Sequence, residues 1–215
     1  MHFIPSFLHG MSGSLLRCFI LVPVLLLAGA CGPASPKLPR LAPDAVVLAF
    51  GDSLTYGTGA LEQESYPAQL EQLIGRRVVR SGVPGEVSAQ ALERLPAALD
   101  EHGPRLLLLC IGGNDFLRRL GNPQAESNVR AMVKLAKSRG IDVLLIGTPQ
   151  PGFSVTAPEF YAAIAKEFRV PYEEGVIGEV LRDSSLKSDQ VHPNAKGYRV
   201  IAERLAADLR KSGAI

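Results

Sequence analysis

The sequence is poor in the residues that most often hold metal ions. It has only three cysteines and four histidines among 215 residues, and no tryptophan. Beyond residue 30 the histidines are His102 and His192, far apart along the chain. A zinc-type ligand set needs several such residues at close spacing, and none can be assembled here. We therefore expect no metal and no other cofactor.

Charge is also scarce. Only 20% of residues are charged and the formal net charge is +2. No dense Lys/Arg stripe is interleaved with aromatic residues, so a nucleic-acid partner is not expected. The length fits one domain with an appendage, and no internal repeat is visible. We expect the protein to act as a monomer.

The first 30 residues are expected to be a signal peptide rather than part of the fold. After Met11, which is an alternative start to Met1, Arg17 precedes an apolar run from Cys18 to Leu27. Small residues follow directly before Cys31. This pattern is typical of secretory signals, and the run is too short to favour a permanent membrane span.

The cysteine at the cleavage point resembles a bacterial lipoprotein signal, in which Cys31 is acylated and becomes the mature N-terminus. Gly32 beside it resembles lipoproteins sent to the outer membrane, so we expect an envelope protein facing the periplasm. The alternatives are an ordinary signal cut near Ala30 and an uncleaved anchor. Residues 31–43 are rich in proline and are expected to form a tether. If Cys18 is removed with the signal peptide and Cys31 carries lipid, Cys110 remains as a buried thiol without a disulfide partner.

From residue 44 to residue 215 apolar runs alternate with amphipathic stretches. The runs are near-continuous in Val, Leu and Ile, which is typical of strands buried on both faces of a parallel sheet. The alternation predicts a three-layer, doubly wound α/β domain of flavodoxin-like type, with a five-stranded sheet and helices on both faces. The expected strands are 45–50, 77–82, 105–112, 142–147 and a weaker 170–174. The expected helices are 65–75, 88–102, 124–140, 158–168 and 194–213.

Polar or glycine-rich segments follow several of these strands. In such sheets the chemistry gathers beyond the carboxyl ends of the strands. The segments are 51–53, 82–85, 112–115 and, near the C-terminus, 189–193. We expect them to converge on one edge of the sheet.

A serine nucleophile needs a base, and the base needs an orienting acid. Ser53 is a candidate nucleophile at the end of the first strand, and His192 is a candidate base. Asp189 lies three residues before His192, so one short loop could supply both base and orienter. The alternatives are a helix cap at Ser53 and a turn or cap residue at Asp189.

The negative oxygen of a tetrahedral intermediate needs hydrogen-bond donors. The candidates are the backbone N–H groups of Ser53 and Gly85 and the side-chain amide of Asn114. Gly82 is a second candidate for the glycine, and the alternative for Asn114 is a helix cap. Asp52 and Asp115 are expected to shape a turn and to cap a helix rather than to bind metal.

Together, "FGDSLTYGTGA", the glycine at 85, "IGGND" and "DQVHP" resemble the four signature blocks of the GDSL or SGNH hydrolases. The resemblance covers residues 45–209 and is nearest to the thioesterase I, lysophospholipase and arylesterase branch. It implies that Ser53 is the nucleophile, His192 the general acid and base, and Asp189 the orienter. The oxyanion donors that it implies are Ser53, Gly85 and Asn114.

The second block departs from the family pattern. It is "RSGVPGEVS", so Arg80, Pro84, Glu86 and Val87 replace the usual residue types.

The expected reaction is hydrolysis of a small acyl ester or lipid, including thioesters and lysophospholipids, through an acyl-enzyme. A carbohydrate O-acetylesterase and a non-catalytic envelope-binding lipoprotein are the alternatives.

Acyl pockets in this branch are built by the loops after the third and fourth strands. Arg118 and Arg119 near the rim could favour an anionic headgroup or serve only solubility. The expected apolar lining, for which helix packing is the alternative, is Leu117, Leu120, Pro149, Phe153 and Phe160.

Overall fold

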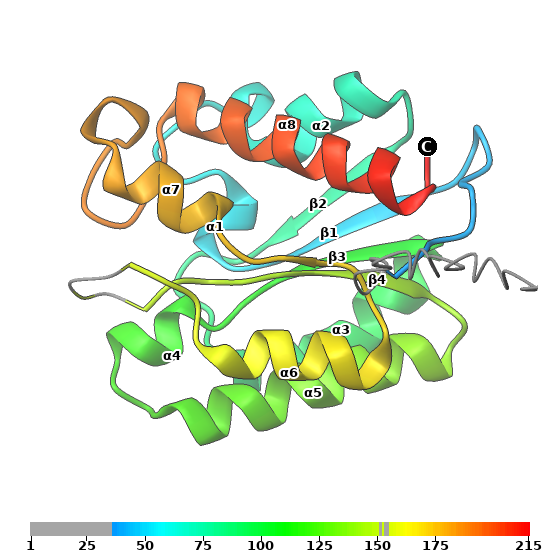
Figure 1. Ribbon diagram of the computed structural model, residues 1–215, viewed down its shortest axis with the longest axis horizontal. Helices are drawn as coiled ribbons and strands as arrows, with labels where there is room; N and C mark the ends of the chain where they lie inside the picture. The colour runs from blue at the N-terminus through cyan, green and yellow to red at the C-terminus, as the bar shows by residue number, and fades with distance from the viewer. Residues whose placement is uncertain (1–35, 151, 153–154) are drawn as a thin grey trace, which may run out of the picture. The chain divides into compact units, whose positions relative to one another are not determined.

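The computed structural model describes residues 36–150, 152 and 155–215, and its centre is a parallel sheet (Figure 1). The strand order is β2-β1-β3-β4-β5. The strands are β1 (Val47–Gly51), β2 (Val78–Gly82), β3 (Leu106–Cys110), β4 (Asp142–Ile146) and β5 (Tyr172–Glu173). All pairings are parallel, as the near-continuous apolar runs predict.

Helices cover both faces of this sheet (Figure 1). They are α1 (Ser53–Tyr56), α2 (Tyr66–Ile74), α3 (Ser88–His102), α4 (Gly113–Leu117), α5 (Asn122–Ser138), α6 (Glu159–Phe168), α7 (Val176–Arg182) and α8 (Ala195–Ser212). Two 3₁₀ turns, η1 (Glu62–Glu64) and η2 (Ser184–Leu186), lie in the loops.

Alternate residues of each strand feed two separate cores, because successive side chains of a strand point to opposite faces. Val47 and Ala49 pack with α2, α7 and α8 on one face. Leu48 and Phe50 pack with α3, α5 and α6 on the other. The expected three-layer, doubly wound fold is confirmed.

The chain adds strands on one side of β1 first and then on the other side. From β1 the chain goes to β2 on one side, and then crosses to β3 on the other side of β1. At such a switch point the loops after the two adjacent strands diverge and leave room for a ligand. The loops after β1 and β3 carry Ser53 and Asn114, so the fold places both residues beside that opening.

The described part of the expected tether is attached to the domain. The backbone N–H of Leu38 donates to the carbonyl of Ser212 at 2.9 Å, and that of Leu41 donates to Ala214 at 2.8 Å. Both leucine side chains are buried in the core. Residues 38–41 of the expected tether (31–43) are therefore packed against the domain, because two leucines among the prolines supply apolar contacts.

The expected signal peptide, Cys31 and the first residues of the expected tether lie outside the described residues. Within the described ranges, no helix is both long and apolar enough to cross a membrane.

Candidate active site

Ser53 begins a short helix directly after the central strand β1. Asp52 is the N-cap of α1, and its Oδ1 accepts a hydrogen bond from the N–H of Leu54 at 3.0 Å. As the first residue of α1, Ser53 has no hydrogen-bond acceptor for its N–H within the helix. The turn therefore leaves both the hydroxyl and the N–H of Ser53 available at the helix N-terminus.

His192 contacts Ser53 although 139 positions separate them along the chain. The distance from His192 Nε2 to Ser53 Oγ is 3.0 Å. On the other side of the ring, His192 Nδ1 lies 2.8 Å from Asp189 Oδ2. A carboxylate can only accept, so Nδ1 carries the proton and Nε2 is left to accept from the serine hydroxyl.

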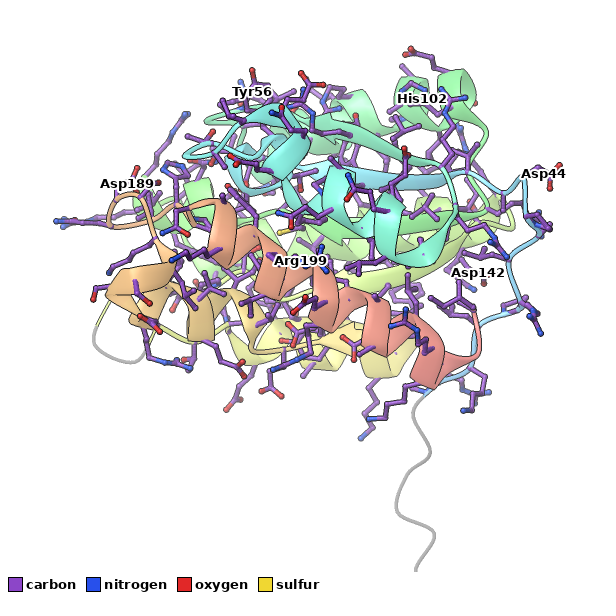
Figure 2. The ribbon with its side chains drawn as sticks, turned by 90° about the horizontal axis from the view of Figure 1, so that it is seen from above. Asp44, Tyr56, His102, Asp142, Asp189 and Arg199 are labelled. Atoms are coloured by element: carbon purple, nitrogen blue, oxygen red, sulfur yellow. The ribbon has the colours of Figure 1, made fainter. Side chains whose placement is uncertain are left out.

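The loop that carries Asp189 and His192 is closed by its own hydrogen bonds. Asp189 Oδ1 accepts from the N–H groups of Val191 and His192, each at 2.8 Å. The N–H of Ser188 donates to the His192 carbonyl at 2.9 Å. Asp189 lies at the opposite end of the molecule from Asp44 and Asp142, which stand at the amino ends of β1 and β4 (Figure 2). The loop thus reaches the carboxyl edge of the sheet.

The Asp189 carboxyl is held in its ionised form. Its partial burial opposes ionisation. The hydrogen bonds from the His192 ring and from the N–H groups of Val191 and His192 outweigh that effect and lower the pKa of Asp189. An ionised carboxylate is the form that holds an imidazole with Nδ1 protonated.

Gly85 lies at the tip of a tight turn after β2. The N–H of Glu86 donates to the Val83 carbonyl at 3.1 Å, and Gly85 has a φ of +79°. With Pro84 at the second position, this is the pattern of a type II turn, which favours glycine at its third position. The hydrogen bond of the turn uses the N–H of Glu86 and leaves that of Gly85 outside it.

Gly82, the second candidate, has a packing role instead. A Cβ there would lie 2.2 Å from the Tyr56 nitrogen and 2.7 Å from the Asp52 carbonyl oxygen. The absence of a side chain at Gly82 is what lets α1 approach β2. Gly85 lines the cavity beside Ser53, and Gly82 does not.

Asn114 is the second residue of α4, and its amide spans two neighbouring loops. Nδ2 donates to the Glu86 carbonyl at 3.0 Å and lies 3.4 Å from Asp52 Oδ2. The first contact is a good hydrogen bond and the second is long. The N–H directed towards Asp52 is therefore the one most easily given to another acceptor.

The two aspartates beside these residues hold the loops together. Asp115 Oδ2 and Oδ1 accept from the N–H and hydroxyl of Ser88 at 2.8 and 2.6 Å, so the carboxylate caps α3 rather than its own helix. Asp52 is buried, and this burial raises its pKa to about 7, opposed by the Leu54 hydrogen bond and by His192.

A cavity of about 490 Å³ opens at this edge of the sheet. Ser53, Gly85, Asn114 and His192 all line it, together with the expected substrate-binding residues Leu117 and Pro149. Several other lining residues were not predicted from the sequence. They are Thr58, Thr148, Val155, Leu181, Lys187, Gln190 and Val191. Of these, Gln190 and Val191 could have been found from their place inside "DQVHP".

Two expected lining residues lie elsewhere. Phe160 is 8% exposed and packs with Tyr161 and Phe116 in the core, because the apolar face of α6 is directed at the sheet. Leu120 is 49% exposed and does not line the cavity, because it follows α4 on the surface. Phe153 lies outside the described residues.

Cys110 is buried at the carboxyl end of β3. Burial raises the pKa of its thiol far above the usual range, so it is neutral. Among the residues that the structure describes, no group of three His, Cys, Asp or Glu side chains is arranged to hold a metal ion.

The chain matches a protein-family model. The model of the GDSL-like Lipase/Acylhydrolase family matches residues 49–200. This range includes Ser53, Gly85, Asn114, Asp189 and His192.

Among curated relatives, the chain is similar to thioesterase 1/protease 1/lysophospholipase L1 of Escherichia coli K12. The two are 32% identical over 179 residues, which is 80% of this chain and 86% of the relative. Esterase TesA of Pseudomonas aeruginosa is 30% identical over 182 residues, 79% of this chain and 89% of the relative.

Solved structures show the same fold. The crystal structure of TesA has a TM-score of 0.69 at 26% identity and covers 78% of this chain and 99% of that chain. AlinE4, an SGNH-hydrolase family esterase, has a TM-score of 0.60 at 30% identity and covers 80% and 98%. The chain therefore belongs to the GDSL-like lipase/acylhydrolase family, and it is a carboxylic ester hydrolase.

Proposed function

We propose that the protein hydrolyses acyl esters in two steps through a covalent acyl-enzyme on Ser53. The observation that carries this proposal is the unbroken line of contacts from Ser53 Oγ to His192 Nε2 and from His192 Nδ1 to Asp189, at 3.0 and 2.8 Å. These are hydrogen-bond distances for an activated nucleophile and its oriented base.

In the first step Ser53 Oγ attacks the ester carbonyl while His192 Nε2 takes the hydroxyl proton. The resulting imidazolium is stabilised by the Asp189 carboxylate. His192 then gives the proton to the departing alcohol or thiol. In the second step a water molecule loses a proton to His192 and attacks the acyl carbon, Ser53 leaves with that proton, and the free acid is released.

Three donors are proposed to stabilise the oxyanion of each tetrahedral intermediate. They are the N–H of Ser53 at the start of α1, the N–H of Gly85 and the amide of Asn114. All three residues line the same cavity. Donors fixed before the reaction need no reorganisation when charge develops on the oxygen.

A fluorophosphonate probe tests this mechanism, because it forms a stable adduct only with an activated serine. We expect strong labelling of the native protein and none of Ser53→Ala. Equal labelling of both proteins, or none of either, would instead favour a non-catalytic envelope-binding protein on the same scaffold.

For the substrate we propose an acyl ester, thioester or lysophospholipid. One relative is named as a thioesterase, protease and lysophospholipase, and another as an esterase. The cavity supports this with apolar walls that include Leu117, Pro149, Val155 and Leu181. Rates on p-nitrophenyl esters of increasing chain length test it, and activity confined to acetyl esters would favour a carbohydrate O-acetylesterase.

We also propose that Cys31 is acylated and anchors the enzyme to the outer membrane, facing the periplasm. The support is the sequence around the cysteine alone. Cys31→Ala is expected to move the protein from the membrane fraction to the soluble fraction. If that variant stays membrane-bound, this anchor is wrong.

A further inference from the structure

Arg94 in α3 makes an unusually complete set of contacts with the loop that carries the glycine donor. Its Nε and one terminal nitrogen (Nη2) donate to the two oxygens of Glu86 at 2.8 and 2.7 Å. The other terminal nitrogen (Nη1) donates to Ser81 Oγ at 2.8 Å. The guanidinium also lies over the Phe50 ring, 4.0 Å from its centroid. Arg94 thus joins the ends of β1 and β2 to Glu86.

Glu86 in turn is linked to two parts of the proposed oxyanion hole, the Asn114 amide and the turn that contains Gly85. It is only 6% exposed, so its carboxylate depends on the two-pronged contact with Arg94. Its carbonyl accepts from Asn114 Nδ2 at 3.0 Å. Its N–H closes the turn that holds Gly85. A shift of Glu86 would therefore move the Asn114 amide and the Gly85 peptide together.

From this geometry we propose that Arg94 is a positioning residue of the oxyanion hole, acting through Glu86 and chiefly on Asn114. The inference rests on the proposed function. Arg94 does not line the cavity, and its contact with the Gly51 carbonyl is long, at 3.4 Å. Its effect on catalysis is therefore transmitted chiefly by the Glu86 carbonyl. This role also accounts for two of the departures in the second signature block, since Pro84 and Glu86 build and fix this turn.

The chemical consequence is confined to the step in which negative charge develops. The oxyanion contacts are made fully only in the transition state, so a misplaced donor lowers kcat and leaves KM nearly unchanged. Displacements of about 1 Å can cost on the order of a hundredfold in rate. A residue that only supported folding would instead lower the fraction of active protein and the unfolding temperature.

Two conservative variants test the proposal without leaving a cavity. Arg94→Lys keeps the charge but loses the two-pronged contact, and Glu86→Gln keeps the shape but loses the charge. For each folded variant we expect kcat on a p-nitrophenyl ester to fall about 10- to 100-fold while KM changes less than about threefold. Asp100→Asn is the matched control. Asp100 lies on the same helix α3 as Arg94, and the substitution breaks its ion pair with Arg139 at the end of α5. The kcat of this variant should equal that of the native protein.

The decisive measurement places Arg94→Lys in an Asn114→Ala background. If Arg94 acts through Asn114, the effect of Arg94→Lys on kcat shrinks to less than about threefold there. Multiplicative effects of the two substitutions on kcat would overturn the proposal, as would a loss confined to the unfolding temperature. A separate failure of the proposed function would show as undiminished turnover by Ser53→Ala, whatever Arg94→Lys does. If Arg94→Lys does not fold, Glu86→Gln is carried through the same cycle.

Discussion

The site residues each use one polar atom for support and leave another for chemistry. His192 Nδ1 is held by Asp189 and frees Nε2 for Ser53. Asn114 binds the Glu86 carbonyl with one N–H and keeps only a long contact, to Asp52, with the other. Because each side chain is fixed by a contact that does not involve substrate, the geometry is set before substrate binds, which is the condition for strong oxyanion stabilisation.

Removing the Asn114 amide should affect the transition state more than substrate binding. For Asn114→Ala we expect kcat to fall roughly 10²- to 10³-fold with KM little changed, as for the loss of one oxyanion donor. Steady-state kinetics on a p-nitrophenyl ester measure both constants. A KM increase with kcat preserved would mean that Asn114 binds substrate rather than the oxyanion.

Asp189→Asn keeps the shape of the loop but removes the negative charge beside His192. We expect kcat to fall on the order of 10²- to 10⁴-fold, because the imidazole loses its preferred tautomer and the stabilisation of its charged form. The same kinetic assay checks this. Native turnover in the variant would show that Asp189 only shapes the turn.

At the scale of helices and strands, the long periodic elements were predictable and the short ones were not. All five strands and the helices α2, α3, α5, α6 and α8 agree with the expected ranges to within two residues at each end. Their apolar periodicity carries enough turns to be recognised. The helices α1, α4 and α7 have four, five and seven residues and no such signal.

Two of those short helices carry Ser53 and Asn114, so the motifs, not the periodicity, located the site. Serine, asparagine, aspartate and histidine residues after the strands identified which loops form the active site. The cavity walls could not be assigned from the sequence, because an apolar residue such as Phe160 is equally suited to a core or a pocket. Which of the two it joins depends on the rotation of its helix against the sheet.

The contact between α1 and β2 makes Gly82 sensitive to substitution. Gly82→Ala should lower the free energy of unfolding by about 1 to 3 kcal/mol or more, because the added Cβ would meet α1 backbone. Urea unfolding measures this. At Gly175, where φ is −122°, a Cβ would meet a Glu179 carboxylate oxygen at 3.4 Å, so Gly175→Ala is the comparison and is expected to be less destabilising. The reverse order would contradict the packing role of Gly82.

At the scale of the whole molecule, the two ends of the sheet have different tasks. The amino end is where residues 38–41 bind the C-terminal segment after α8. The carboxyl end holds the catalytic loops, and Figure 2 shows Asp189 there, far from Asp44. Two buried carboxyl groups lie at the carboxyl end, those of Asp52 and Asp115, each 1% exposed. Stability should therefore depend on pH through that end.

The pKa of Asp52 predicts the sign of this dependence. Burial raises it from 3.8 to about 7, so between about pH 4 and pH 7 the folded state keeps a proton that the unfolded state has lost. Folding is then favoured at the acidic end and loses stability as pH rises through this window. Asp52→Asn, which cannot ionise, removes the effect.

Urea unfolding at pH 4.5 and 7.5 measures it. The unfolding free energy of Asp52→Asn minus that of the native protein should increase by about 2 to 3 kcal/mol between the two pH values. Other carboxyls titrate in both proteins and cancel in the difference. A difference that is independent of pH would show that Asp52 is ionised in the folded protein throughout.

The most direct test of the central claim is to trap the acyl-enzyme and locate it. The native protein is mixed with a p-nitrophenyl ester, quenched in acid within its first turnovers, digested and analysed by mass spectrometry. We predict a peptide that carries the mass of the acyl group on Ser53, and no such peptide from Ser53→Ala. An acyl group on another residue, or hydrolysis by Ser53→Ala at the native rate, would contradict the account.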